Sequence, residues 1–247
     1  MGFSLKSITS ENEKRGLCTV LYGEGGCGKT TLCASIPSVE KALFMSCEDG
    51  LSVLGLDGVA RTPLIDNWSD FQEQLEALAL EDHDYKVIFI DTLDAAYEFL
   101  EEYVIKTFYG GDADAAKSYG AKYNELRSEF GKVIKAFKLM TTKGINVVPI
   151  IHSEVKKRRM PDTEEYDFYS LNLGGGKKGN ASDMLYNFSD NTVFMRKDVL
   201  VKDGKGIGGA RVLMTQWAPA YLAKSRSDVP EKVACDPAFF ENNFLSL

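Results

Sequence analysis

The fold is decided by the stretch LCTVLYGEGGCGKTT, which covers residues 17–31. Its start is an apolar run that predicts a buried strand, and residues 29–36 predict a short helix ended by Pro37. Between them, residues 23–30 fit the pattern G-x-x-x-x-G-K-[ST]. Glycines let successive backbone N–H groups converge on phosphate oxygens, and the helix amino terminus adds a partial positive charge. The stretch therefore predicts a phosphate-binding loop between a strand and a helix.

Two side chains of this motif have separate tasks in the predicted site. Lys29 is expected to reach the β- and γ-phosphates of a nucleotide, and Thr30 to offer its hydroxyl to Mg²⁺. A further strand, residues 86–91, ends in Asp91, whose carboxylate is expected to hold the metal's water shell. Thr92 either hydrogen-bonds near the γ-phosphate or caps the next helix. The predicted cofactors are therefore ATP and Mg²⁺. The residues expected to bind the nucleotide are Gly23, Glu24, Gly25, Gly26, Cys27, Gly28, Lys29, Thr30 and Thr31.

The rest of the chain alternates predicted strands with predicted helices. The further strands are expected over residues 41–47, 86–91, 145–151, 192–196 and 211–217, and the helices over residues 68–80, 93–108 and 121–141. Short, continuous apolar strands separated by helices are typical of a parallel sheet that is covered on both faces. A turn over residues 203–209 predicts that the last two strands pair antiparallel. The pattern indicates one α/β domain.

The composition narrows the class of protein. The chain has 247 residues, a formal net charge of −7 and 44% hydrophobic residues, which excludes a mainly disordered chain. No apolar run approaches the roughly 18 residues of a membrane span, and the polar start is unlike a secretory signal. The five cysteines include no CxxC pair, which favours a reducing, cytoplasmic setting over a disulfide framework or a zinc site. The acidic balance argues against coating of nucleic acid through bulk charge, but local basic loops can still contact phosphates.

Hydrolysis also needs a residue that orients or deprotonates a water molecule. Ligands of open α/β sheets gather at the carboxyl ends of the strands. Glu48 directly follows the strand at 41–47, and Asp49 is the alternative. His152 ends the strand at 145–151, where it is either a sensor of the γ-phosphate or a neutral, hydrogen-bonded strand-end histidine.

The order of these motifs resembles the core of the RecA superfamily. The chain is similar to the short RecA-like phage proteins of the Sak type, which act in single-strand annealing and recombination. The resemblance implies a mostly parallel central sheet with helices on both faces and an antiparallel C-terminal strand extension. It also implies a RecA-like ATPase core over residues 15–226. An N-terminal segment, residues 1–14, would either dock on a neighbouring subunit or fray, and residues 227–247 would form a C-terminal tail.

The resemblance also implies roles for individual residues. Glu48 matches the water-activating glutamate of the family, and His152 matches the strand-end sensor, which is often glutamine in RecA itself. Residues 223–226, AKSR, are similar to the K-x-R element of RadA-like and KaiC-like ATPases, whose basic pair reaches the γ-phosphate of the neighbouring subunit. That motif continues with Phe-Gly, whereas residues 227–228 are Ser-Asp, and the alternative is an ordinary solvated basic pair. The expected catalytic residues are Glu48, Lys29, His152, Lys224 and Arg226.

Two polar segments, residues 109–120 and 154–179, match the loops with which RecA-like proteins grip single-stranded DNA. Basic side chains neutralise phosphates, glycine-rich backbone approaches them closely, and aromatic rings stack on bases. The alternative is a flexible, solvated loop with aromatic residues packed beneath it. The residues expected to contact DNA are Lys117, Tyr119, Lys156, Lys157, Arg158, Arg159, Lys177 and Lys178.

These features predict a self-assembling protein that binds and hydrolyses ATP, binds single-stranded DNA and acts in recombination or annealing. The expected assembly is a ring or filament of identical subunits with ATP between them, and a single-strand-binding protein is a further candidate partner. No membrane partner is expected, and the expected setting is the cytoplasm, that of the host cell if the chain is phage-encoded. Two other classes stay open: a P-loop kinase acting on a small molecule or nucleotide, and a nucleotide-gated structural protein with weak hydrolysis.

Overall fold

The computed structural model describes residues 14–50, 58–117, 121–174 and 180–247. Residues 1–13, which make up most of the expected N-terminal segment, lie outside this part of the chain. In chain order the elements are β1 (Thr19–Gly23), α1 (Lys29–Cys33), η2 (Val39–Lys41), β2 (Ala42–Ser46), β3 (Ala60–Arg61), α3 (Trp68–Leu80), β4 (Val87–Asp91), α4 (Leu93–Tyr109), α5 (Ala113–Lys117), α6 (Ala121–Thr142), β5 (Asn146–Arg158), β6 (Tyr166–Leu171), α7 (Ala181–Phe188), β7 (Asn191–Lys202), β8 (Lys205–Met214), β9 (Lys232–Ala234) and α8 (Pro237–Phe244).

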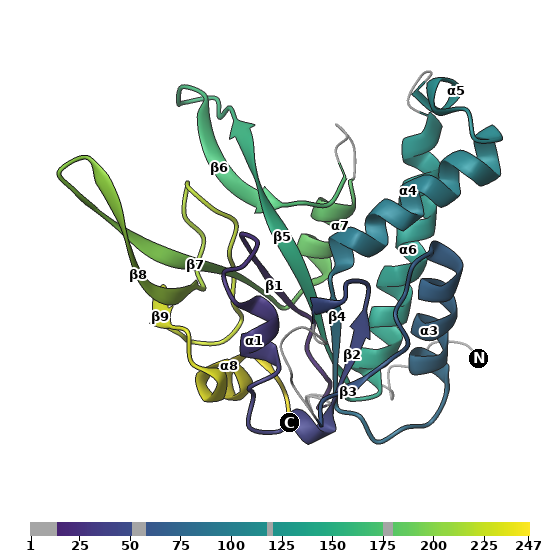
Figure 1. Cartoon of the computed structure of the whole chain (residues 1–247), viewed down its shortest axis with the longest axis horizontal. Helices are drawn as coiled ribbons and strands as arrows, with labels where there is room; N and C mark the ends of the chain where they lie inside the picture. Colours follow the sequence, from purple (N-terminus) through teal and green to yellow (C-terminus); the bar gives the residue numbers. More distant parts are fainter. Residues whose placement is uncertain (1–13, 51–57, 118–120, 175–179) are drawn as a thin grey trace, which may run out of the picture.

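One twisted sheet forms the centre of the molecule (Figure 1). Within the described residues its order is β3-β2-β4-β5-β1-β7-β8-β9, and β6 pairs with the outer half of β5. The strands from β3 to β7 in this order are parallel, whereas β8 and β9 are antiparallel additions at one edge. The central strands β1, β2 and β4 are buried along their whole length, as a parallel sheet covered on both faces requires. The expected fold class, including its antiparallel C-terminal extension, is confirmed.

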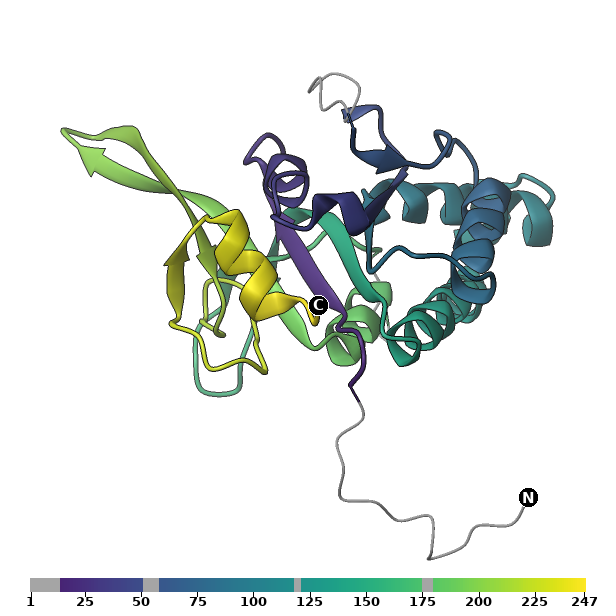
Figure 2. The same ribbon diagram turned by 90° about the horizontal axis from the view of Figure 1, so that it is seen from below.

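Helices cover both faces of the sheet (Figure 2). Two hydrophobic cores lie between these helices and the sheet. On one face pack α3, α4, α6 and α7, which enclose the almost fully buried Phe130 and Phe137. The other face is covered by α1 and α8, and there Phe240 and Phe244 are fully buried. Residues 227–247, expected as a C-terminal tail, thus contribute β9 and α8 to this unit. None of the helices in the described ranges is both long and apolar enough to cross a membrane.

Two antiparallel hairpins extend from the edge of the sheet at which the parallel strands end (Figure 1). The first is formed because β5 continues through Arg158 and pairs with β6. The prediction of a polar loop over residues 154–179 is therefore wrong for these two strands. The outer part of β5 is exposed and rich in charged side chains, so it lacks the apolar pattern that predicts a strand. Its partner β6 buries Phe168 and Leu171.

The second hairpin joins β7 to β8 around a two-residue turn. Asp203 and Gly204 have φ of 53° and 71°, so the turn is shorter than the expected one over residues 203–209. Two-residue turns of this kind need positive φ at both positions, which the Asp-Gly pair supplies. The strand expected over 211–217 is accordingly β8, which begins directly after the turn and ends at Met214.

The boundaries of two helical segments also differ from expectation. The helix expected over residues 29–36 ends at Cys33. After α4, Gly110 adopts a φ of 60° and caps the helix. The expected DNA loop at 109–120 then contains the short helix α5, because the carboxylate of Asp112 accepts backbone N–H groups at its start.

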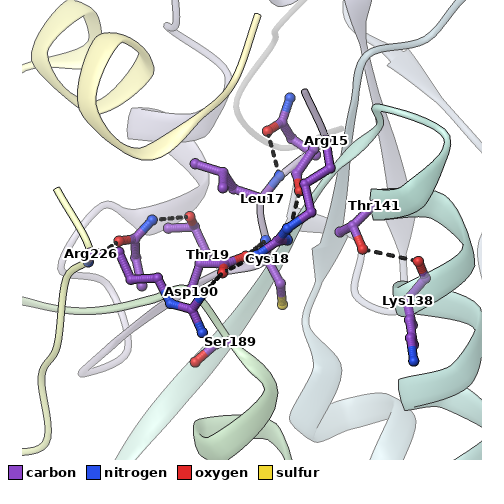
Figure 3. A network of polar contacts seen from close by, with 12 residues as sticks. Arg15, Leu17, Cys18, Thr19, Lys138, Thr141, Ser189, Asp190 and Arg226 are labelled. Atoms are coloured by element: carbon purple, nitrogen blue, oxygen red, sulfur yellow. Dashed lines mark hydrogen bonds and ion pairs between the residues drawn. The ribbon is translucent and has the colours of Figure 1, made fainter. Parts of the chain in front are cut away.

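A buried carboxylate, Asp190, links the start of the core to the segment that follows β8 (Figure 3). Its side chain is 2% exposed and accepts two hydrogen bonds from Arg15, at 3.0 and 2.5 Å. It also accepts the backbone N–H of Cys18 at 3.1 Å and lies 3.2 Å from Nη1 of Arg226. A desolvated charge of this kind is tolerated only while its partners remain in place.

Asp190→Ala is expected to lower the free energy of unfolding by about 1–3 kcal/mol, since it leaves the buried N–H of Cys18 without an acceptor and removes the partner of Arg15. Urea denaturation followed by circular dichroism measures the change. Arg226→Ala is the control. Because the Arg226 side chain is 69% exposed, removing it is expected to lower the free energy of unfolding by less than about 1 kcal/mol. Equal losses in the two variants would contradict a central role for Asp190.

Candidate nucleotide-binding site

The glycine-rich loop connects β1 to α1 at the carboxyl end of the parallel strands. In the sheet register, Gly23 at the end of β1 lies between His152 of β5 and Met195 of β7. A Cβ added to Gly23 would lie 2.2 Å from the carbonyl oxygen of Met195. Gly26 and Gly28 have φ of 70° and 103°, which residues with a Cβ rarely adopt. The loop therefore requires glycine at several of the positions that its sequence pattern specifies.

Lys29 is a buried cation without an anionic partner. It is 5% exposed, and its Nζ donates hydrogen bonds to the carbonyl oxygens of Gly23 and Glu24, at 2.9 and 3.0 Å. No carboxylate forms an ion pair with it in the described part of the chain. Because a desolvated ammonium is costly unless an anion compensates it, this arrangement fits a bound polyphosphate chain.

Thr30 and Asp91 meet beside the loop. Thr30 Oγ1 donates to Asp91 Oδ2 at 2.9 Å, and Asp91 is 3% exposed at the end of β4. Burial raises the pKa of Asp91 to about 6, against the opposing effects of the Thr30 hydrogen bond and of Lys29. Mg²⁺ usually takes only one or two protein oxygens together with phosphates and water, and this pair fits that requirement. In residues 14–50, 58–117, 121–174 and 180–247, no group of three or more His, Cys, Asp or Glu side chains could hold a metal ion. Thr31, the next residue of α1, is exposed.

Glu48 follows β2 and lies beside this pair. The backbone N–H groups of Cys47 and Glu48 donate to the carbonyl oxygen of Asp91, at 2.8 and 3.2 Å. Thr92 Oγ1 donates to Glu48 Oε1 at 2.7 Å and also accepts the N–H of Ala95 at 3.4 Å. The Asp91–Thr92 peptide bond is cis. Thr92 is thus the N-cap of α4, one of its two expected roles, and in addition it orients Glu48.

His152 faces the loop from β5 and is paired with Asp94. Its Nδ1 lies 2.8 Å from Asp94 Oδ2, and its backbone N–H donates to Asp94 Oδ1 at 3.2 Å. The hydrogen bond to Asp94 raises the pKa of His152, although burial opposes this. With Nδ1 occupied, Nε2 faces the loop, where a Cβ added to Gly25 would lie 3.9 Å from it. A protonated imidazole in this position can donate a hydrogen bond to an anion bound in the loop.

Asp94 belongs to the site although no sequence motif marks it. Its own pKa is raised by burial but lowered further by the hydrogen bonds with His152, and the net shift is downward. It therefore stays ionised as the partner of the histidine. An acidic residue in the first turn of a helix is too common to be recognised as part of a site, so only the three-dimensional contact identifies it.

Lys224 and Arg226 lie away from the phosphate loop of their own chain. Lys224 pairs with Thr192 at the start of β7, whereas the loop lies beside Met195, three residues or about 10 Å further along the strand. Lys224 Nζ donates to the carbonyl oxygen of Tyr186 and lies 4.7 Å from the centroid of that ring. Arg226 belongs to the buried carboxylate network (Figure 3). A role of the two residues at the site of a neighbouring subunit stays a prediction.

Four of the residues expected to contact DNA lie on and just after the outer part of β5. They are Lys156, Lys157, Arg158 and Arg159. The Nζ of Lys156 lies 2.7 Å from Oε1 of Glu154, and the Nζ of Lys157 lies 3.5 Å from Oε1 of Glu165. Arg158 packs over an aromatic ring of β6, 4.3 Å from its centroid. Because successive residues of a strand point to opposite sides, these cations are divided between the two faces of the hairpin.

The other four residues expected to contact DNA belong to different segments. Lys117 is the last residue of α5, which is well separated from the hairpin (Figure 1). Tyr119, Lys177 and Lys178 lie outside the described residues.

The family described as "AAA domain" matches residues 15–227, and the chain belongs to this family. Its mainly parallel sheet, with the phosphate loop directly after β1, is that of a P-loop domain. The crystal structure of the RadB recombinase is similar at 18% identity and a TM-score of 0.47, over 88% of this chain and 84% of that chain. The KaiC-like protein PH0186 from Pyrococcus horikoshii OT3 is similar at 12% identity and a TM-score of 0.45, over 88% of each chain. No curated protein matches the chain.

The raised pKa of Asp91 predicts that metal use depends on pH. At or below about pH 6 its carboxyl group is increasingly protonated in the metal-free protein, and a proton must leave before Mg²⁺ binds. Mg²⁺ affinity in the presence of nucleotide is therefore expected to fall by about tenfold for each pH unit below this pKa. Mg²⁺ titrations with a fluorescent ATP analogue measure it.

Two controls separate this effect from the titration of His152. Nucleotide affinity in EDTA at the same pH values reports the protonation effects that do not involve the metal, including those of His152 and of the terminal phosphate. Asp91→Asn lacks the titrating carboxyl group, so its weak Mg²⁺ affinity is expected to depend less steeply on pH than that of the wild type. A wild-type Mg²⁺ affinity that is unchanged at acidic pH would contradict the assignment of Asp91 to the metal.

Proposed function

We propose that this chain is a self-assembling protein that hydrolyses ATP, binds single-stranded DNA and acts in annealing or recombination, like the short RecA-like phage proteins. The observation that carries the proposal is the buried, unpaired ammonium of Lys29 beside the Thr30–Asp91 pair, with Glu48 and His152 next to them. Membership of the AAA-domain family supports the ATPase part.

The side chains around the loop divide the steps of hydrolysis among them. Bound Mg²⁺ would neutralise charge on the phosphates. Lys29 donates to the β- and γ-phosphate oxygens, and His152, held by Asp94, donates to the γ-phosphate from Nε2. Glu48, oriented by Thr92, accepts a proton from the attacking water. Each group is thus placed before the reaction begins, which is what electrostatic stabilisation requires.

The strand β5 connects the γ-phosphate side of the site to the first hairpin. It is 13 residues long, and His152 lies in its middle, six positions before Arg158. A hydrogen bond gained or lost at His152 therefore acts on the strand that carries the basic residues expected to contact DNA. In this proposal, bound ATP favours one position of the hairpin, and hydrolysis releases it.

The position of Lys224 and Arg226 supports the proposed self-assembly. Lys224 pairs with Thr192, three residues before β7 reaches the loop of its own chain, so in this proposal the pair serves a γ-phosphate that a neighbouring copy holds. The side chain of Arg226 is 69% exposed and accessible to such a neighbour. The proposed assembly is a ring or filament with ATP between the subunits.

One observation favours a second candidate function, that of a P-loop kinase. A cavity of about 260 Å³ adjoins Glu48 and is lined among others by Ser46, Arg61 and Thr62. An arginine beside a carboxylate base is a combination that could hold an anionic phosphate acceptor. A kinase would consume ATP only with its acceptor present and would not respond to an oligonucleotide.

Glu48→Gln is expected to reduce ATP turnover by about 10²- to 10⁴-fold while ATP binding is retained, because the amide cannot accept the water proton. The measurement is ATPase activity with and without single-stranded oligonucleotide, with light scattering to follow assembly. Lys29→Ala is the contrasting variant, for which ATP binding itself is expected to be lost. Wild-type turnover in Glu48→Gln, or tight ATP binding by Lys29→Ala, would contradict the proposed mechanism.

Reversing the charges of Lys156, Lys157, Arg158 and Arg159 to glutamate is expected to weaken binding to a poly-dT oligonucleotide and to reduce its salt dependence. Fluorescence anisotropy at several salt concentrations measures both quantities. The matched control reverses four exposed lysines that lie in α6 or just before the amino ends of β2, β4 and β5, namely Lys41, Lys86, Lys138 and Lys143. This control changes the net charge equally, so equal weakening by both variants would remove the hairpin from the DNA interface.

A further inference from the structure

A second cation besides Lys29 contacts the phosphate loop. Arg211 belongs to β8, and its guanidinium group lies against Gly28. The Cζ and Nη1 atoms are both 2.9 Å from the position of a Cβ added to Gly28, and Nε is 3.2 Å from it. Glycine is therefore needed at position 28 for this contact as well as for its φ of 103°.

The guanidinium of Arg211 has no acidic partner in the described residues. No carboxylate lies within ion-pair distance of it there, and its side chain is exposed. Its backbone is fixed, because the carbonyl oxygen accepts the N–H of Cys235 at 3.1 Å next to β9. The position of β8 in the sheet, rather than an ion pair, thus holds a free planar cation with several N–H donors at the loop.

The strand order determines which end of a nucleotide Arg211 can meet. Glu48, Asp91 and His152 follow or end β2, β4 and β5, which all lie on one side of β1. They place the γ-phosphate and the metal on that side of the loop. β7 and β8 lie on the other side of β1, so a nucleotide that spans the loop directs its nucleoside end toward Arg211.

We propose that Arg211 is a nucleotide-positioning residue, which contacts the ribose and base side of a bound nucleoside di- or triphosphate in the same chain. A guanidinium suits this task because it stacks on a planar base and hydrogen-bonds to ribose oxygens without losing its charge. Lys29, Thr30 and Asp91 hold the opposite end. The inference rests on the nucleotide binding that the proposed function requires, and it adds the residue that favours a nucleotide over a bare polyphosphate.

The test compares three ligands by isothermal titration calorimetry in the presence of Mg²⁺: ATP, ADP and inorganic tripolyphosphate. Arg211→Ala is expected to raise the dissociation constants of ATP and ADP by roughly tenfold, the size of one cation–π or charge-assisted contact. Its affinity for tripolyphosphate, which has no nucleoside, is expected to stay within about twofold of the wild type, because the lost contact is to the ribose and base.

The control is Arg196→Ala, in the neighbouring strand. Arg196 pairs with Val212, so its side chain lies on the face of the sheet opposite Arg211, and its removal is expected to leave all three affinities unchanged. Arg211→Lys keeps the charge but not the planar group, so it is expected to lower the affinity for ADP but not the affinity for tripolyphosphate. This variant keeps the test available if the alanine variant fails to fold.

Unchanged ADP affinity in both Arg211 variants would overturn the inference. Equal losses of affinity for ADP and for tripolyphosphate would also overturn it, because they would show that Arg211 only stabilises the loop. A wild-type chain that binds none of the three ligands would overturn the proposed function together with this inference. Wild-type binding with no difference among the variants overturns the role of Arg211 alone.

Discussion

The site depends on the charge of Lys29 remaining uncompensated within the chain. Its ammonium is buried but is hydrogen-bonded to two carbonyl oxygens of the loop, while the acids at the ends of the neighbouring elements contact other side chains. Asp91 accepts the hydroxyl of Thr30, Glu48 that of Thr92, and Asp94 is committed to His152. Because these acids already have partners, the positive charge is left for an external anion, and the flanking strands keep the loop in the shape that presents it.

Those parts of the fold and site that depend on short sequence spacing were predictable. The loop with Lys29 and Thr30 is a local motif, and Asp91 and Glu48 each follow an uninterrupted apolar strand. Since the carboxyl ends of parallel strands meet at one edge of the sheet, a local pattern was enough to bring these residues together. The parallel core and the antiparallel strands after β7 follow from the same alternation of apolar strands and helices.

Features that depend on long-range register could not be predicted. Arg211 reaches the loop only because β8 pairs with β7 in one particular alignment, which no local pattern encodes. The extension of β5 escaped recognition because its outer residues are charged, and exposed hairpins do not need the apolar alternation by which strands are recognised. Lys224 and Arg226 lie away from the loop. Their distance from it depends on how β7 is aligned with β1, which the sequence does not show.

A single uninterrupted strand, β5, belongs to the parallel sheet over its first half and to the hairpin over its second half. No linker separates the two, so the hairpin cannot swing freely and can only tilt as far as a continuous backbone ladder bends. Insertions or substitutions at its tip would change its reach and surface without disturbing the residues around the phosphate loop. Sequence changes beyond the sheet would therefore alter the surface of the hairpin and leave the geometry of the loop intact.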